Sequence, residues 1–137
     1  GPERLKMEQL CRNLDLCDNV RFIGKLKAVE RVLSVSDLFL LPSETESFGL
    51  VALEAMASKV PVVSSNSGGL PEVNIEGKTG FLLDVKDIDS MAKKAILLLA
   101  DENRLKQFKE NAFSHAMEFD LPNILPLYEK IYEDLSK

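Results

Sequence analysis

The sequence predicts an α/β fold: a Rossmann-like, doubly wound parallel sheet covered by helices. Short continuous apolar runs alternate along the chain with longer segments in which apolar residues recur every three or four positions. Continuous apolar runs are typical of strands buried on both faces of a parallel sheet, and the longer period is typical of amphipathic helices. Strands that alternate with helices indicate parallel pairing through helical crossovers. The 137 residues are expected to form a single unit with its own core.

The first half of the chain is expected to hold three helices and two strands. Leu5, Leu10 and Leu14 follow a helical period, and Pro42 closes an apolar run that is expected to be buried on both faces. A run rich in Ala, Leu, Glu and Met then favours a helix. The expected elements are a helix over 3–16, a strand over 20–24, a short helix over 29–35, a strand over 37–42 and a helix over 48–58.

The second half is expected to add two strands and three helices. Asp87 is a candidate N-cap, and Pro122 suits the first turn of a helix. The segment 66–72 is expected to be a loop because it is rich in Gly, Ser and Asn. The expected elements are a strand over 60–65, a strand over 80–85, and helices over 87–99, 102–118 and 122–135.

The composition argues against several partners. The chain has 17 Lys+Arg and 22 Asp+Glu, a formal net charge of −5, so no basic face is expected for nucleic acid or for an anionic membrane. The longest apolar runs, such as residues 95–100, are far shorter than the ~20 residues that span a bilayer. Cys11 and Cys17 are expected to be reduced thiols of a cytoplasmic protein, and the lone His115 a helix residue rather than a general base.

The start of the chain suggests a piece of a larger protein. Residues 1–3 read GPE and lead straight into a helix, so the strand that normally precedes such a helix is expected to be missing. Gly1 and Pro2 are either the native turn after that strand or a remnant of tag removal.

The candidate binding edge is the one where parallel strands end. Ligands of such sheets bind at the carboxyl ends of the strands, which here lead into the segments 43–49 and 66–72. Gly49 falls where a helix begins, so the N–H groups of Phe48, Gly49 and Leu50 are free to face an anion. A diphosphate is the expected ligand. The pair Gly68 and Gly69 fits either a close approach of backbone to ligand or a plain turn.

Two acids flank this helix start. Glu46 and Glu54 are eight positions apart, on the order of 12 Å along a helix axis, so they are expected to bracket a ligand rather than to share a proton. One carboxylate would then accept hydrogen bonds from a ribose and the other from a transferred sugar. Spacing alone favours the plainer alternative that both are solvated acids. The glycine-rich strings of dinucleotide oxidoreductases and P-loop NTPases do not occur.

Four strings resemble the retaining glycosyltransferases of the GT-B fold, specifically the family 4 group. Residues 46–54 read ESFGLVALE, which resembles the E-x7-E motif of that family. Further matches are PVV at 61–63, GGLPE at 68–72 and GKTGFL at 77–82. The resemblance runs from residue 1 to about 99 and more loosely to the end. It identifies residues 1–137 as a nucleotide-sugar-binding C-terminal Rossmann-like domain, one part of a two-domain enzyme.

The resemblance assigns roles to individual residues. It implies that Glu54 binds the ribose and that Glu46 is the catalytic residue, in contact with hydroxyls of the donor sugar. It also implies a cradle for the sugar and diphosphate and a loop that reads the base, typically uracil. The cradle comprises Glu46, Ser47, Phe48, Gly49 and Leu50, and the base-binding loop comprises Gly24, Lys25 and Leu26.

The same resemblance implies the activity. Ser47 stands where many members have glycine. In this respect the sequence is most similar to the subgroup that transfers N-acetylglucosamine from UDP-GlcNAc to L-malate in bacillithiol biosynthesis. No cofactor and no metal are expected, because the helix start and an Arg/Lys pair from upstream of this chain neutralise the diphosphate. The expected partner is an N-terminal domain that carries the acceptor site. Without it the chain alone is not expected to turn over.

Other readings stay open. The helix over 122–135 is expected to pack toward the N-terminal domain, and its apolar face predicts self-association into a homo-oligomer when uncovered. One alternative is a non-catalytic nucleotide-sugar-binding or assembly module. Another is a different GT-B enzyme, such as a UDP-sugar epimerase or a sugar-phosphate synthase.

Overall fold

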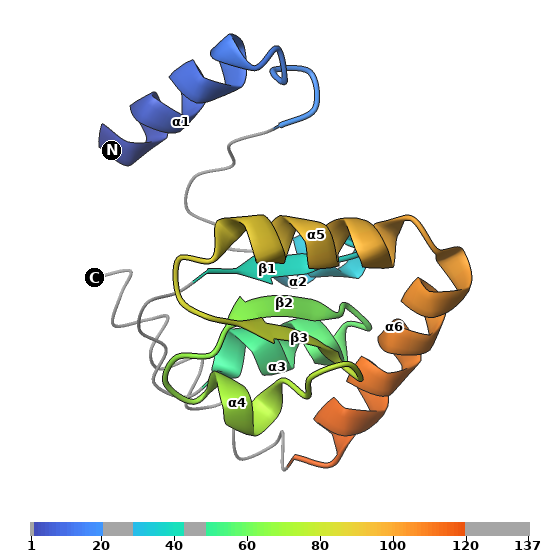
Figure 1. Cartoon of the computed structure of the whole chain (residues 1–137). Helices are drawn as coiled ribbons and strands as arrows, with labels where there is room; N and C mark the ends of the chain where they lie inside the picture. The colour runs from blue at the N-terminus through green and yellow to red at the C-terminus, as the bar shows by residue number, and fades with distance from the viewer. Residues whose placement is uncertain (1, 21–28, 43–48, 120–137) are drawn as a thin grey trace.

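The computed structural model describes residues 2–20, 29–42 and 49–119 (Figure 1). Helix α1 (Pro2–Asn13) confirms the predicted first helix, and Figure 1 shows it set apart from the sheet. Apart from Val20, which is in no strand, the strand predicted over 20–24 lies outside the described residues. The helix predicted over 122–135 also lies outside them. None of the described helices is long and apolar enough to cross a membrane.

The described part of the chain forms a three-stranded parallel sheet in the order β1-β2-β3. Its strands are β1 (Phe39–Leu41), β2 (Val62–Ser65) and β3 (Gly80–Leu83). Phe39 pairs with Val62, and Val62 pairs in turn with Gly80. This confirms the predicted parallel sheet, and β2 is buried along its whole length, as its apolar run predicts.

Helices cover both faces of the sheet, as a doubly wound fold requires. They are α2 (Val29–Ser34), α3 (Leu50–Ala57), α4 (Leu70–Val73), α5 (Ile88–Leu99) and α6 (Glu102–Met117). Figure 1 shows α5 on one face and α3 and α4 on the other. Successive residues of β2 divide accordingly: Val62 packs in the cluster formed with α3 and α4, and Val63 in the cluster formed with α5.

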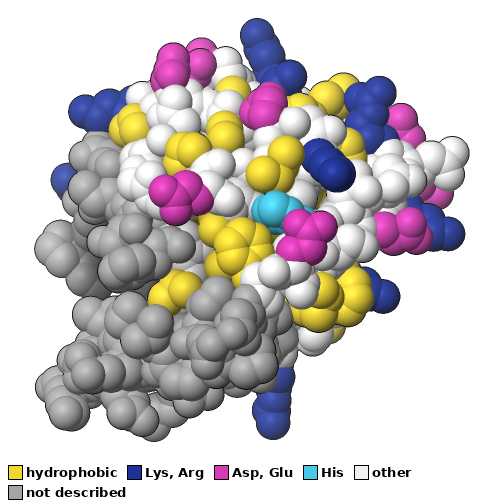
Figure 2. Space-filling model, turned by 90° about the horizontal axis from the view of Figure 1, so that it is seen from below, with side chains coloured by type: hydrophobic (Ala, Val, Ile, Leu, Met, Phe, Trp, Pro, Cys, Tyr) yellow, Lys and Arg dark blue, Asp and Glu magenta, His cyan; other side chains and the backbone are white. Residues whose placement is uncertain are grey.

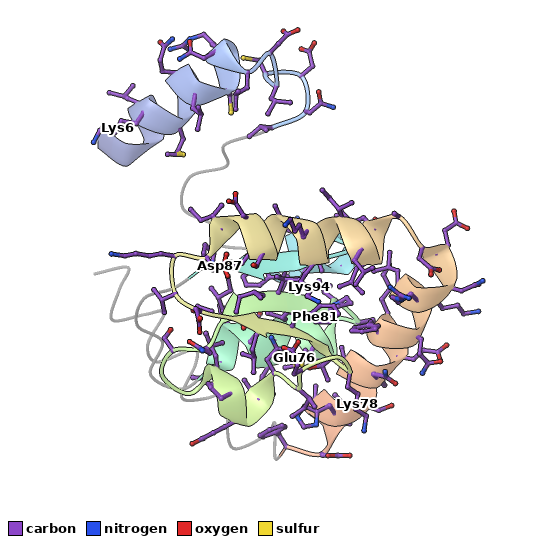
Figure 3. The ribbon with its side chains drawn as sticks, in the orientation of Figure 1. Lys6, Glu76, Lys78, Phe81, Asp87 and Lys94 are labelled. Atoms are coloured by element: carbon purple, nitrogen blue, oxygen red, sulfur yellow. The ribbon has the colours of Figure 1, made fainter. Side chains whose placement is uncertain are left out.

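Helix α6 joins the two layers of the core. Phe108, near its middle, belongs to the α5 cluster and stacks on Phe81 with 5.5 Å between the ring centroids. Ala112, one turn later, is fully buried in the α3 cluster. Lys94 of α5 covers Phe81 from above, with its Nζ 4.7 Å from the ring centroid (Figure 3). Helix α6 therefore packs against the clusters on both faces of the sheet.

Side-chain caps set the starts of the last two helices. Asp87 Oδ1 accepts a hydrogen bond from Ser90 N at 3.2 Å, which confirms the predicted cap of α5. Asp101 Oδ1 accepts from Arg104 N at 3.1 Å at the start of α6. Each aspartate satisfies a first-turn N–H that has no partner within the helix.

Two sequence predictions are wrong in detail. The predicted loop 66–72 runs into α4, because Leu70 and Val73 are both buried one turn apart and Pro71 suits a first turn. The predicted strand 37–42 is not buried on both faces, since Leu40 of β1 is 52% exposed. Leu40 pairs with Val63 and lies on the same face, but the described helices that cover Val63 leave Leu40 open.

Candidate functional site

The three parallel strands end along one edge of the sheet, at Leu41, Ser65 and Leu83. The residues that follow β2 and β3 are tied together there. Asn66 N donates to Leu83 O at 2.9 Å, and Asn66 Nδ2 donates to Asp84 Oδ1 at 3.2 Å. Ser65 Oγ and Ser67 Oγ lie 3.0 Å apart at the same place. The segments that follow β2 and β3 are therefore polar and hydrogen-bonded to each other, and ligands of open parallel sheets bind at this edge.

Gly49 forms the N-cap of α3 at this edge, which confirms that the helix begins at the predicted glycine. Its φ of 67° lies in the left-handed region, which favours glycine. A Cβ on Gly49 would lie 2.7 Å from Val73 Cγ2 and 3.4 Å from Gly69 O. Glycine is required here both by the backbone conformation and by the close approach of α4. The starts of α3 and α4 consequently lie against each other.

The first turn of α3 carries no compensating group among the described residues. Gly49 provides no side-chain cap, and the turn contains no acidic residue. The first bond within the helix is Leu53 N to Gly49 O at 3.0 Å, so the N–H groups of Leu50, Val51 and Ala52 precede it. Together with the helix dipole, these N–H groups favour a bound anion at this end. By contrast, α5 and α6 both start with an aspartate cap.

Glu54 lies in the same helix, and it is not a solvated surface acid. Its side chain is half-buried, and the carboxylate atom Oε2 is buried. Burying a carboxylate costs free energy unless hydrogen bonds or charges compensate. The position is roughly 7 Å along the axis from Gly49 at 1.5 Å per residue. The plainer alternative from the sequence, that Glu54 is simply solvated, does not fit this burial.

The structure brings together some of the predicted site residues. Gly49, Leu50 and Glu54 all belong to α3 or its cap: Gly49 lies at the start of the helix, and Glu54 lies five residues further along it. The other predicted residues lie outside the described residues, so their roles stay predictions: Glu46, Ser47 and Phe48 of the cradle, and Gly24, Lys25 and Leu26 of the base-binding loop.

Sequence reasoning missed a buried pair of polar side chains between the end of α4 and the start of β3. Asn74 and Thr79 are both 0% exposed and hydrogen-bond to each other, with 2.8 Å between Thr79 Oγ1 and Asn74 Oδ1. The only signal in the sequence is an amide and a hydroxyl close to the apolar residues that flank β3. Buried polar groups are normally hydrogen-bonded, so a buried amide at this place has an identifiable structural role.

His115 lies near the end of α6, as expected of a helix residue. Its Nδ1 lies 3.5 Å from Glu118 Oε2, and its ring meets Phe119 edge-on with 5.2 Å between centroids. Figure 2 shows the histidine at the surface beside hydrophobic and acidic side chains. Cys11 and Cys17 are free thiols, as predicted. In the described ranges, no group of three or more His, Cys, Asp or Glu side chains is placed to hold a metal ion.

Comparison with known proteins decides the family. The family model for glycosyl transferases group 1 matches residues 1–115. The chain belongs to this family. A relative from Bacillus anthracis, N-acetyl-alpha-D-glucosaminyl L-malate synthase, is 46% identical over 136 residues, covering 98% of this chain and 36% of that protein. The resemblance predicted from the E-x7-E string is thus confirmed.

Solved structures of glycosyltransferases have the same fold. Sucrose-phosphate synthase from Thermosynechococcus elongatus superposes with a TM-score of 0.80 at 31% identity, over 98% of this chain and 35% of that one. Anabaena HepE in complex with UDP and glucose gives 0.78 at 28% identity, over 96% of this chain and 35% of that one. These matches confirm the predicted α/β, GT-B type of fold. This group 1 glycosyl transferase chain spans 36% of the length of the Bacillus relative.

Proposed function

We propose that this chain is the donor-binding domain of a retaining hexosyltransferase that takes N-acetylglucosamine from UDP-GlcNAc. The acceptor is a small molecule such as L-malate, held by a separate N-terminal domain of the same cytoplasmic protein. The 46% sequence identity to an N-acetyl-alpha-D-glucosaminyl L-malate synthase supports this choice of donor sugar and of acceptor class. The observation that carries the proposal is the start of α3 at Gly49, which has no side-chain cap among the described residues, with the half-buried Glu54 in the same helix.

The start of α3 is the proposed seat of the donor diphosphate. The helix dipole places about half a positive charge there. In the transfer reaction the bond between the sugar and the diphosphate breaks, and negative charge grows on the leaving oxygen. Fixed N–H groups stabilise that charge without having to reorganise. In this proposal Leu50 and Gly49 donate their backbone N–H groups, and neither a metal ion nor a cofactor is used.

Glu54 is the proposed partner of the ribose. A carboxylate accepts two hydrogen bonds, one from each of two neighbouring hydroxyl groups. Its partial burial strengthens such bonds, because the surrounding dielectric is lower than that of water. Glu46, Ser47 and Phe48 complete the proposed cradle for the sugar and diphosphate, with Glu46 as the catalytic residue that contacts the donor sugar.

Calorimetric titration of the chain with UDP and with ADP tests the donor half of the proposal. UDP is expected to bind more tightly than ADP. Glu54→Gln is expected to weaken UDP binding by about tenfold or more, because hydrogen bonds to a charged group contribute about 1.5–3 kcal/mol. The control is Glu110→Gln, which changes an exposed acid of α6 and is expected to leave the affinity unchanged. Equal losses in both variants would contradict the ribose contact.

Product analysis tests the reaction itself on a full-length protein that carries this chain. Incubation with UDP-GlcNAc and L-malate is expected to give N-acetylglucosaminyl malate with retained α configuration, detected by mass and by NMR. A product that incorporates a sugar phosphate, or an epimerised UDP-sugar, would assign the protein to another GT-B activity. UDP binding with no turnover of any donor would favour a binding or assembly module.

A further inference from the structure

Asn74 is a buried amide that connects α4 to two strands. It follows α4 directly, as its C-cap, and is 0% exposed. The two N–H groups of its Nδ2 are shared among three acceptors: Val62 O at 3.0 Å, Ser64 Oγ at 2.9 Å and Phe81 O at 3.2 Å. One side chain thus contacts β2 twice and β3 once.

Thr79 completes this network from the other side. Its Oγ1 donates to Asn74 Oδ1 at 2.8 Å and accepts from Ile75 N at 2.7 Å. Thr79 N also donates to Ile75 O at 3.0 Å, which closes the turn between α4 and β3. Both the nitrogen and the oxygen of the Asn74 amide therefore have hydrogen-bond partners. These bonds fix the position of the end of α4 relative to the sheet.

The residue before Asn74 contacts the candidate site. Val73 is the last residue of α4 and is buried against the start of α3. Its Cγ2 occupies the space that a Cβ on Gly49 would need, and Gly69 O, from the N-cap of α4, lies near the same point. Both ends of α4 therefore contact the cap of α3. Moving α4 by a fraction of an ångström displaces Gly49 or opens a gap beside it.

We propose that Asn74 is a positioning residue for the donor diphosphate, acting through Val73 on Gly49 and the first N–H groups of α3. This inference rests on the proposed function, because it assumes that the start of α3 binds the donor. Preorganised donors stabilise developing charge only when they are held in place. An apolar residue of similar size would fill the same volume, but only directional hydrogen bonds fix the rotation of α4 relative to β2 and β3.

The nature of the network supports a role in positioning. Replacing both partners of a buried hydrogen bond by apolar groups of the same shape is often nearly neutral for stability. A fully satisfied buried network instead specifies one arrangement of the elements it joins. Here those elements are α4, β2 and β3. Because α4 contacts Gly49, the network also fixes the position of Gly49.

Four variants of the chain test this inference. Asn74→Leu removes the amide, and Thr79→Val removes only the hydroxyl that donates to it. Thr79→Ser keeps that hydroxyl and is the conservative rescue. Leu98→Ala is the matched control, because Leu98 is fully buried in the α5 cluster, on the opposite face of the sheet from α4. It lowers stability without touching the network.

Calorimetry with UDP provides the first measurement. Asn74→Leu and Thr79→Val are expected to weaken UDP binding by about tenfold, equivalent to about 1.4 kcal/mol. Thr79→Ser and Leu98→Ala are expected to bind like the unchanged chain. If Asn74→Leu does not fold, Thr79→Val carries the same test, because it deletes one hydroxyl and keeps the size of the side chain.

Amide NMR without nucleotide provides the second measurement. The amide resonances of Gly49, Leu50 and Leu53 are expected to shift in Asn74→Leu and Thr79→Val and to stay in place in Leu98→Ala. UDP affinity unchanged in Asn74→Leu and Thr79→Val would overturn the inference and leave the proposed function standing. Failure of the unchanged chain to bind UDP, tested also in the full-length protein, would overturn the proposed function and this inference with it.

Discussion

Val73 fills the space that a side chain on Gly49 would occupy, with 2.7 Å between Val73 Cγ2 and the position of a Cβ on Gly49. Real carbon atoms do not approach so closely, so a valine at position 73 leaves no room for a side chain at position 49. Gly49 begins α3, and Val73 ends α4. This pair is the point at which two helices from separate crossovers meet beside the candidate diphosphate site.

The first prediction concerns Gly49→Ala. It is expected to destabilise the chain in two ways: a left-handed backbone costs an alanine roughly 1–2 kcal/mol, and overpacking against Val73 adds about 1–3 kcal/mol. UDP binding is expected to fall as well, because the first turn of α3 must shift. Urea unfolding and calorimetry measure the two effects.

Gly77→Ala is the matched control for that prediction. Gly77 has a φ of 74°, close to the 67° of Gly49, but a Cβ there would meet nothing within 4 Å. It is therefore expected to show the backbone cost alone and to bind UDP normally. Val73→Ala introduced into Gly49→Ala is expected to recover part of the lost stability. Equal losses in Gly49→Ala and Gly77→Ala would show that contact with α4 is unimportant.

The second prediction concerns the cap of α5. Asp87→Ala is expected to lower the free energy of unfolding by about 1 kcal/mol, because Ser90 N loses its acceptor. Asp87 lies at the start of α5 (Figure 3). Asp89→Ala, in the first turn of the same helix, loses only the favourable interaction with the helix dipole, about 0.3–1 kcal/mol. A larger loss for Asp89→Ala in urea unfolding would contradict the cap assignment.

The third prediction concerns the close packing of α6 on α3. Ala112 is fully buried between these helices, so Ala112→Leu is expected to cost about 1–3 kcal/mol through overpacking. Lys106→Leu, on the exposed part of the same helix, is expected to change stability by no more than about 0.5 kcal/mol. Because α3 carries Gly49 and Glu54, Ala112→Leu is also expected to weaken UDP binding. Normal stability in Ala112→Leu would refute the packing.

Much of the fold was predictable because its signals are local. The apolar runs predicted the described strands, the spacing of apolar residues predicted α1, α2 and α3, and a candidate cap at Asp87 marked the start of α5. The helix α4 was missed because a single turn cannot display a period, and its Gly-Gly-Leu-Pro run is typical of a loop. The exposure of Leu40 was missed because an apolar run does not tell which helix covers it.

The candidate site was predictable only where one residue carries the signal. A glycine at a helix start has a local reason, and Gly49 was placed correctly. Asn74 has no such signal, because its partners Val62, Ser64 and Phe81 are brought to it by the folding of two strands. Long-range hydrogen bonds leave no periodic trace in a sequence. The structure was needed to find the residue that connects α4 to the sheet.

The last prediction concerns the outer edge of β3. In the described part of the chain β3 is an edge strand, and Glu76 Oε2 accepts a hydrogen bond from Leu82 N at 2.6 Å (Figure 3). A carboxylate thus takes the place of a neighbouring strand on this amide. Exposed strand edges invite pairing with another chain, and charged side chains are one way that proteins prevent it.

Glu76→Ala is therefore expected to increase self-association of the chain at high concentration and to speed hydrogen exchange of the Leu82 amide. Light scattering and amide exchange measure the two effects. Lys78→Ala is the control, because its side chain is exposed and its backbone oxygen still accepts from Asn111 Nδ2 at 3.1 Å. Lys78→Ala makes the net charge of −5 more negative, whereas Glu76→Ala makes it less negative. If Lys78→Ala nevertheless associates as strongly as Glu76→Ala, the carboxylate of Glu76 is not what prevents the association. If the Leu82 amide is the only amide of β3 that exchanges faster in Glu76→Ala, the carboxylate protects this amide and not the whole strand.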